Sequence, residues 1–199
     1  MGAGITALPA HCFDGCEKLS DINLDNVISY DDESLTGTSL SSVTVNCNAT
    51  FLAGSFNSNK SLVSITLPDN LISIPKYMLA DCTNLVDFKL PTATTEIKDM
   101  AFAGCTKLEL TVPDTVVTFG RNCFEDVKMV YCTSNSACAK YCEENGVKYK
   151  LTDVAPPNAN DFEVTLSEDS FVYSGYEEKP ENVTVYYKGK ELWGASPYV

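Results

Sequence analysis

Residues 79–91 have the sequence Leu-Ala-Asp-Cys-Thr-Asn-Leu-Val-Asp-Phe-Lys-Leu-Pro. From Leu79, apolar positions recur after three, three, three and two residues, and Pro91 closes the run. Residues 13–24 repeat this spacing from Phe13. A match of this length indicates an internal repeat, which determines the fold more strongly than any local pattern.

Copies of this block cover residues 5–132. Each copy has one large apolar anchor, and the steps between successive anchors are 22, 21, 23, 23 and 22 residues. A period in this range predicts a solenoid, here of about six turns, in which stacking buries a face that one turn cannot bury alone. The anchors are Phe13, Leu35, Phe56, Leu79, Phe102 and Phe124.

The end of each repeat alternates between apolar and polar residues. This alternation predicts one short parallel β-strand per turn, with every second side chain facing inward. The expected strands are centred on 22–24, 43–45, 65–67, 88–90, 110–112 and 129–132.

Two segments carry a resemblance to a known family. Residues 74–85 and 97–108 are similar to the leucine-rich repeats of the BspA-like bacterial surface proteins, and the resemblance covers about 130 of 199 residues. It implies a right-handed leucine-rich repeat solenoid displayed outside the cell, commonly associated with adhesion and binding, without a conserved catalytic site. The second repeat lacks the Phe and Cys, and one residue is missing before Leu110, so irregular stacking is expected in these two turns.

Residues 133–151 are expected to cap the solenoid. Residues 134–145 predict a helix, Gly146 is a good C-terminal stop, and residues 147–151 predict a final strand. A solenoid needs such a cap over its open end. The solenoid with its cap is therefore assigned to residues 1–151.

A Pro- and Asn-rich linker is expected over residues 152–160. From 161 to 199 the pattern changes to the alternation typical of antiparallel strands, at 162–166, 171–173, 183–187 and 191–193. This segment resembles the opening half of a bacterial immunoglobulin-like module. The absence of a secretory signal fits either a cytosolic protein or an interior fragment. Because about 40 residues are too few for a sandwich to stand alone, the chain is expected to be a fragment of a longer protein.

Charge and composition narrow the classes of partner. Fourteen basic and 27 acidic residues give a net charge of −13, which is the wrong sign for binding nucleic acid or anionic lipid. No uninterrupted apolar run exceeds four residues, so membrane insertion is not expected. The expected partner is a protein or peptide, for example a host surface protein, and no cofactor is predicted.

The cysteines are expected to serve the core. Nine is an odd number, so at least one thiol should be free. The sequence contains no Cys-x-x-Cys pair of the kind that would indicate a zinc site. Cys82 and Cys105 hold equivalent positions on adjacent turns, within reach of a disulfide, but parallel stacked side chains keep the β-carbons beyond ~3.8 Å. This geometry favours buried thiols, and Cys12 and Cys123, which precede anchors, are also expected in the core.

The sequence predicts no catalytic or metal site. His11 is the single histidine, so any His-dependent mechanism would have to use it, and a surface position is the simpler interpretation. The acidic group at residues 31–33 lacks the alternation of a calcium loop.

The candidate binding surface is therefore the outward side of the predicted strands. None of its ten positions holds an aromatic residue, and a solvated Ser/Thr-rich sheet is an equal alternative. These positions are Asp21, Asn23, Ser42, Thr44, Ser64, Thr66, Asp87, Lys89, Glu109 and Thr111.

The leading hypothesis is a non-enzymatic interaction module at the cell surface or in a secreted protein. Two alternatives stay open, a purely structural stalk of a larger surface protein and a Cys/His-dependent enzyme.

Overall fold

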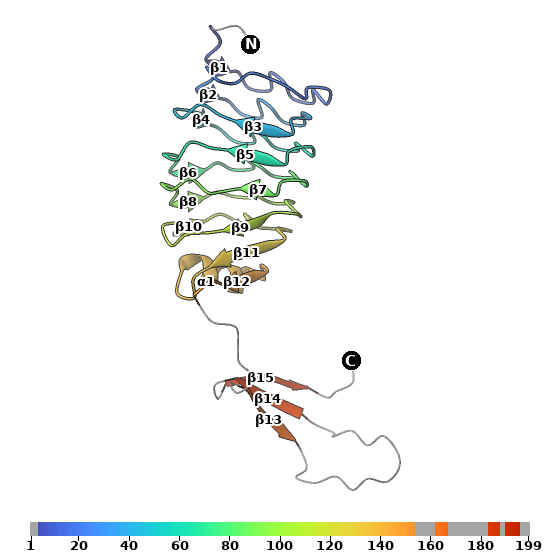
Figure 1. Ribbon diagram of the computed structural model, residues 1–199, viewed down its shortest axis with the longest axis vertical. Coiled ribbons are helices and arrows are strands. Elements are labelled where there is room, and N and C mark those ends of the chain that lie inside the picture. The colour runs from blue at the N-terminus through green and yellow to red at the C-terminus, as the bar shows by residue number, and fades with distance from the viewer. Residues whose placement is uncertain (1–3, 154–161, 167–182, 188–189, 196–199) are drawn as a thin grey trace. The chain divides into compact units, whose positions relative to one another are not determined.

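The computed structural model describes residues 4–153, 162–166, 183–187 and 190–195 (Figure 1). The chain divides into two compact units, Met1–Val154 and Ala155–Val199. Each unit is described by itself.

The first unit is a parallel β-solenoid of about seven turns. Figure 1 shows two columns of short strands along it. We name the first column the major ladder: β3 (Ser42–Thr44), β5 (Ser64–Thr66), β7 (Asp87–Phe88), β9 (Glu109–Thr111), β11 (Met129–Cys132) and β12 (Tyr149–Leu151). The minor ladder holds β1 (Ala7–Leu8), β2 (Ser29–Tyr30), β4 (Thr50–Phe51), β6 (Ser73–Ile74), β8 (Glu96–Ile97) and β10 (Thr118–Phe119).

The prediction of one strand per turn is wrong, because the minor ladder adds a second. Five of the six predicted strands are confirmed in the major ladder, but residues 22–24 form no strand. The Asn23 side chain explains this difference: its Oδ1 accepts the Asp25 backbone N–H at 3.0 Å, and this local turn competes with strand pairing. The count of six turns is also too low, since β12 continues the major ladder beyond the last anchored repeat.

The major ladder is interrupted between β7 and β9. Phe88 follows Leu85 by three positions, but Leu110 follows Leu108 by only two. The irregularity expected at this shortened repeat is therefore confirmed. The second repeat, by contrast, stacks regularly in this ladder, with β3 paired to β5 in register from Ser42 to Thr44.

Between the minor ladder and the major ladder, each turn passes through a five-residue segment centred on its anchor. We call this segment the return leg. The N–H of each of the first five anchors donates to a carbonyl of the next turn at 2.9 to 3.1 Å. The residues two before and two after the anchor donate in the same way, so three such bonds join neighbouring return legs.

Both flanking positions of the return leg adopt the left-handed region, with φ between 52° and 77°. This conformation brings the N–H groups of alternate residues to the side of the next turn. The positions before the anchors are His11, Glu33, Gly54, Tyr77, Met100 and Asn122, and those after them are Gly15, Gly37, Ser58, Asp81, Gly104 and Asp126.

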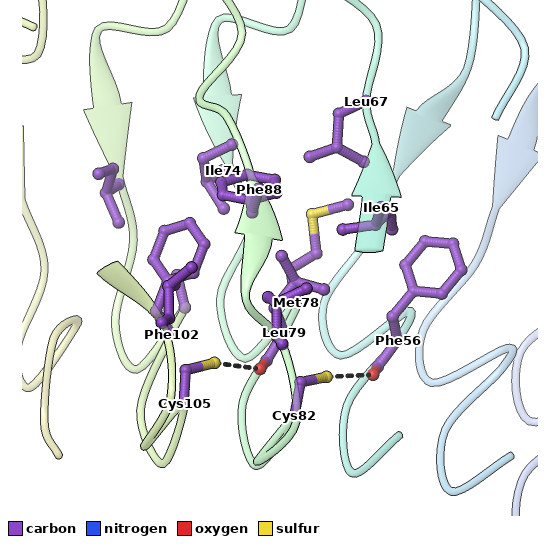
Figure 2. Packing of buried hydrophobic residues seen from close by; sticks show 14 of the residues in the cluster. Phe56, Ile65, Leu67, Ile74, Met78, Leu79, Cys82, Phe88, Phe102 and Cys105 are labelled. Atoms are coloured by element: carbon purple, nitrogen blue, oxygen red, sulfur yellow. Dashed lines mark hydrogen bonds between the residues drawn. The ribbon is translucent and has the colours of Figure 1, made fainter. Parts of the chain in front are cut away.

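The anchors fill the interior. Phe56, Leu79 and Phe102 are fully buried, and Phe102 packs against Phe124 and Phe88 with ring centroids 6.3 and 5.3 Å apart. Figure 2 shows this stacking of inward side chains from strands and return legs. Phe13, in the first turn, is only partly buried.

Cys82 and Cys105 are both fully buried, as expected. Their thiols do not face each other: Cys82 Sγ donates to Phe56 O at 3.3 Å and Cys105 Sγ to Leu79 O at 3.1 Å (Figure 2). Asn59, at the same repeat position, donates to Leu35 O at 2.8 Å. In these three turns, the position three residues after the anchor thus satisfies a carbonyl of the preceding anchor.

The core assignment of Cys123 is confirmed, whereas that of Cys12 is wrong. Cys123 is fully buried beneath Tyr141, but Cys12 lies in the first turn and is exposed. Cys12 Sγ reaches only the Ser34 carbonyl of the second turn, at 3.5 Å.

The predicted helix is confirmed as α1 (Ala137–Asn145), which begins three residues later than expected. Ser136 caps it by accepting the Ala139 N–H at 3.1 Å, and Gly146 ends it with φ 67°. Tyr141 stacks on Phe119 at 5.1 Å, so the helix covers apolar side chains of the last repeats. Among the described residues, no helix is long and apolar enough to span a membrane.

The second unit holds one antiparallel sheet in the order β13 (Phe162–Leu166), β14 (Val183–Tyr187) and β15 (Lys190–Ala195). These strands confirm the alternation at 162–166, 183–187 and 191–193. The strand expected at 171–173 and most of the linker lie outside the described residues. The immunoglobulin-like module stays a prediction.

Replacing Phe102 by Ala should lower the free energy of unfolding by about 3–5 kcal/mol, because the change leaves a cavity among fully buried rings. Urea denaturation measures this loss, with the exposed Thr106→Ala as control. A loss below about 1 kcal/mol, the size of an ordinary surface effect, would contradict the role of Phe102 as a core anchor.

Candidate binding face on the major ladder

The outward residues of the major ladder form two exposed columns. Ser42, Ser64 and Asp87 are in register in the first column, and Thr44 is paired with Thr66 in the second. We call this surface the strand face. Glu109 begins the next group of strands in the first column. The other predicted residues, Asp21, Asn23, Lys89 and Thr111, are all exposed, but Asp21 and Asn23 lie in the first turn, which has no strand in the major ladder.

The N-terminal part of the strand face is neutral, and some of its hydroxyl groups are hydrogen-bonded to each other. The hydroxyls of Ser42 and Ser64 are 2.8 Å apart and hydrogen-bonded to each other. Thr44 and Thr66 follow in the second column with no charged neighbour in their paired positions. This part therefore offers a flat surface of small polar groups.

Sequence reasoning missed the C-terminal continuation of both columns. Tyr131 pairs with Thr111 on one side and with Lys150 on the other, and Met129 pairs with Glu109. Because the strand at 129–132 was predicted, its alternation already indicated that Tyr131 faces outward. The strand face thus contains an aromatic residue at its C-terminal end.

Glu109 organises this end of the strand face. Its carboxylate lies 2.8 Å from Lys128 Nζ and accepts a hydrogen bond from Tyr131 Oη at 3.1 Å. The Lys128 ammonium is the main cause that lowers the pKa of Glu109, with the Tyr131 hydroxyl second. The same contacts raise the pKa of both Lys128 and Tyr131. The side chains of Glu109 and Lys128 are about half exposed, so these contacts hold surface groups in place.

His11 lies away from the strand face, on the first return leg. Its Nδ1 is 3.3 Å from Asp14 Oδ2 and 3.5 Å from Glu33 Oε2. Imidazole and carboxylates are donors that bind transition metals. Here all three side chains are about half exposed, and their contacts with one another account for their positions.

An activated nucleophilic thiol needs both exposure and a lowered pKa, and Cys12, Cys105, Cys123 and Cys142 do not combine the two. Partial burial raises the pKa of Cys12, and burial raises those of Cys105 and Cys123 to about 12. The pKa of Cys142 is lowered by the Cys138 thiol 4.0 Å away, but Cys142 is fully buried.

A surface cleft of about 530 Å³ lies between the last repeat, α1 and the segment that follows α1. Phe124 and Tyr141 line its apolar part, and Glu125, Lys128 and Lys148 line its rim. Lys128 therefore belongs both to this cleft and to the Glu109 cluster of the strand face.

Comparisons with known proteins agree with this geometry. Residues 1–61 match the family model of the BspA type leucine rich repeat region, which holds six copies. Over these residues the chain is similar to BspA-type leucine-rich repeats. The remaining turns, down to β12, continue the same parallel stacking.

The crystal structure of a leucine-rich repeat protein from Bacteroides ovatus is similar, with a TM-score of 0.51 and 19% identity. The match covers 68% of this chain and 49% of that protein, so the chain spans about half of its length. At this identity the likeness shows a shared leucine-rich repeat fold. No curated protein matches the chain.

Native alkylation should modify three cysteines, because Cys12, Cys16 and Cys47 are exposed and the other six are buried. Denaturation without a reductant should raise the number of labels to nine, since all nine thiols are free. Intact mass spectrometry counts the labels, and Cys47→Ser should reduce the native count by one. Fewer than nine labels after denaturation would reveal a disulfide.

Glu109 should titrate below the ordinary range of a glutamate. Because its pKa is lowered in the folded protein, its contribution to stability is present above the unfolded pKa and is lost as the pH falls through the folded pKa. NMR titration of the carboxyl carbon measures the midpoint. Lys128→Met should raise the midpoint, and an unchanged midpoint would show that the ion pair does not form in solution.

Proposed function

We propose that this chain is a non-enzymatic protein-binding module of a cell-surface or secreted protein and that the strand face contacts the partner. The observation that carries this proposal is the pair of outward-facing columns on the major ladder, in register from β3 to β7 and again from β9 to β12. Leucine-rich repeat modules generally bind proteins, and those of the BspA type are typically surface-associated.

The dimensions of the strand face suit a peptide segment or a protein loop. Six strands spaced by ~4.8 Å span about 24 Å between the first and the last. The side chains project from backbone held in both ladders and in the return legs, so little conformational freedom is lost on binding.

The competing structural reading is a stalk whose strand face is only a solvated surface. The Ser42–Ser64 hydrogen bond supports it, because these hydroxyls already satisfy each other. A catalytic reading has less support: His11 contacts two carboxylates, and the Cys12 thiol contacts a carbonyl and has a raised pKa.

The test replaces Thr44, Thr66, Lys89 and Thr111 together by glutamate. Binding of candidate host surface proteins, measured by surface plasmon resonance, should fall at least about tenfold, because side chains at the centre of a protein interface carry most of its affinity. Circular dichroism and the melting temperature establish that the variant folds.

A matched control lies on the minor ladder side of the solenoid. Thr50, Thr95, Lys98 and Thr118 are also three threonines and one lysine, and all four are exposed. Their replacement by glutamate makes the same change in net charge and should leave binding within about twofold, as peripheral contacts do. Equal binding by both folded variants would place the partner elsewhere or leave the module as a stalk.

A further inference from the structure

Charge is unevenly distributed along the solenoid. Residues 1–60 contain two basic and seven acidic residues, whereas residues 121–151 contain five basic and four acidic residues. With Asp153 included, this end is neutral, whereas the chain as a whole has a charge of −13. This end includes the last two strands of the major ladder, β11 and β12.

Several of these basic residues gather on the strand face. Lys150 is adjacent to Tyr131 across the β11–β12 pairing, and both Lys148 and Lys150 are exposed at β12. Lys89 is the exposed residue that follows β7. Lys128 pairs with Glu109, whereas Lys148 and Lys150 form no ion pair among the described residues. We call this set, Lys89, Lys128, Tyr131, Lys148 and Lys150, the basic end of the strand face.

Tyr131 gives the basic end an apolar surface held in a fixed orientation. Its hydroxyl donates to Glu109, which is itself held by Lys128. The aromatic ring is partly exposed between Thr111 and Lys150. Tyrosine is enriched at protein interaction hot spots, where it supplies contact area, and the charge of the neighbouring lysines supplies selectivity.

We propose that the basic end of the strand face binds an extended, acidic peptide segment of the partner protein. This inference rests on the proposed function and names the chemistry of the partner. Carboxylates of the segment pair with Lys150 and Lys89, and its backbone lies across the Tyr131 ring. Charge complementarity carries the assignment to an acidic segment.

The negative charge of the rest of the chain does not oppose this binding strongly. The Debye length is about 8 Å at physiological ionic strength, so carboxylates in the first turns are screened from a ligand at β11 and β12. On the strand face itself the acidic groups are Glu109, already paired with Lys128, and Asp87, while Glu125 and Asp126 line the adjacent cleft with Lys128 and Lys148. Contact pairs with the lysines therefore dominate.

The probe for the test is a fluorescein-labelled hexaglutamate peptide, measured by fluorescence anisotropy with the full chain. Lys150→Glu and Tyr131→Ala should each weaken its binding about tenfold, the effect of losing one good contact. Lys98→Glu, at an exposed lysine beside the minor ladder, makes the same charge change and should leave binding within about twofold. Tyr131→Phe keeps the ring and should retain most of the affinity.

Three results would overturn the proposal: no binding of hexaglutamate, equal binding of hexaglutamine, or equal loss in Lys150→Glu and Lys98→Glu. Tighter binding of a heparin hexasaccharide or an oligothymidylate than of hexaglutamate would also overturn it, in favour of another polyanion. If the Thr44/Thr66/Lys89/Thr111 variant loses a host protein that Lys150→Glu and Tyr131→Ala still bind, the acidic-peptide proposal fails and the strand face remains a binding surface.

Discussion

The main-chain hydrogen bonds between neighbouring return legs are the constraint on which this solenoid depends. They require twelve left-handed residues, of which only Gly15, Gly37, Gly54 and Gly104 are glycines. A left-handed conformation costs other residues about 1 kcal/mol or more, roughly what one such hydrogen bond returns. The geometry is therefore stable only when turns stack in register, and the strands, anchors and buried thiols all follow that register.

The major ladder could be predicted from sequence because its anchors and alternating residues repeat with a nearly constant period. The minor ladder could not, since strands of two residues, such as Glu96–Ile97, are too short to show alternation. Left-handed positions held by Tyr77 and Met100 carry no local signal either, because neither residue favours that region. The failure of residues 22–24 to form a strand depends on one side chain, Asn23, competing for the backbone.

The candidate site was predictable to the extent that it follows the strand period. The columns through Thr44 and Asp87 came directly from that period, and Tyr131 obeys it as well. The Glu109–Lys128–Tyr131 cluster could not be predicted from the strand period, because Lys128 precedes its strand and contacts Glu109 of the neighbouring turn. Such contacts depend on the register between turns and on side-chain length, and only coordinates supply these.

The division of roles within each turn explains how such a scaffold can acquire a ligand. The identity of inward residues such as Phe88 is restricted by packing. The repeat position of Cys82 and Asn59 must hold a side chain that donates a hydrogen bond to a buried carbonyl. Outward residues of the major ladder have no such obligation. Their identities can vary without disturbing the core, so an exposed charged residue on this face, such as Lys150, can be selected for recognition.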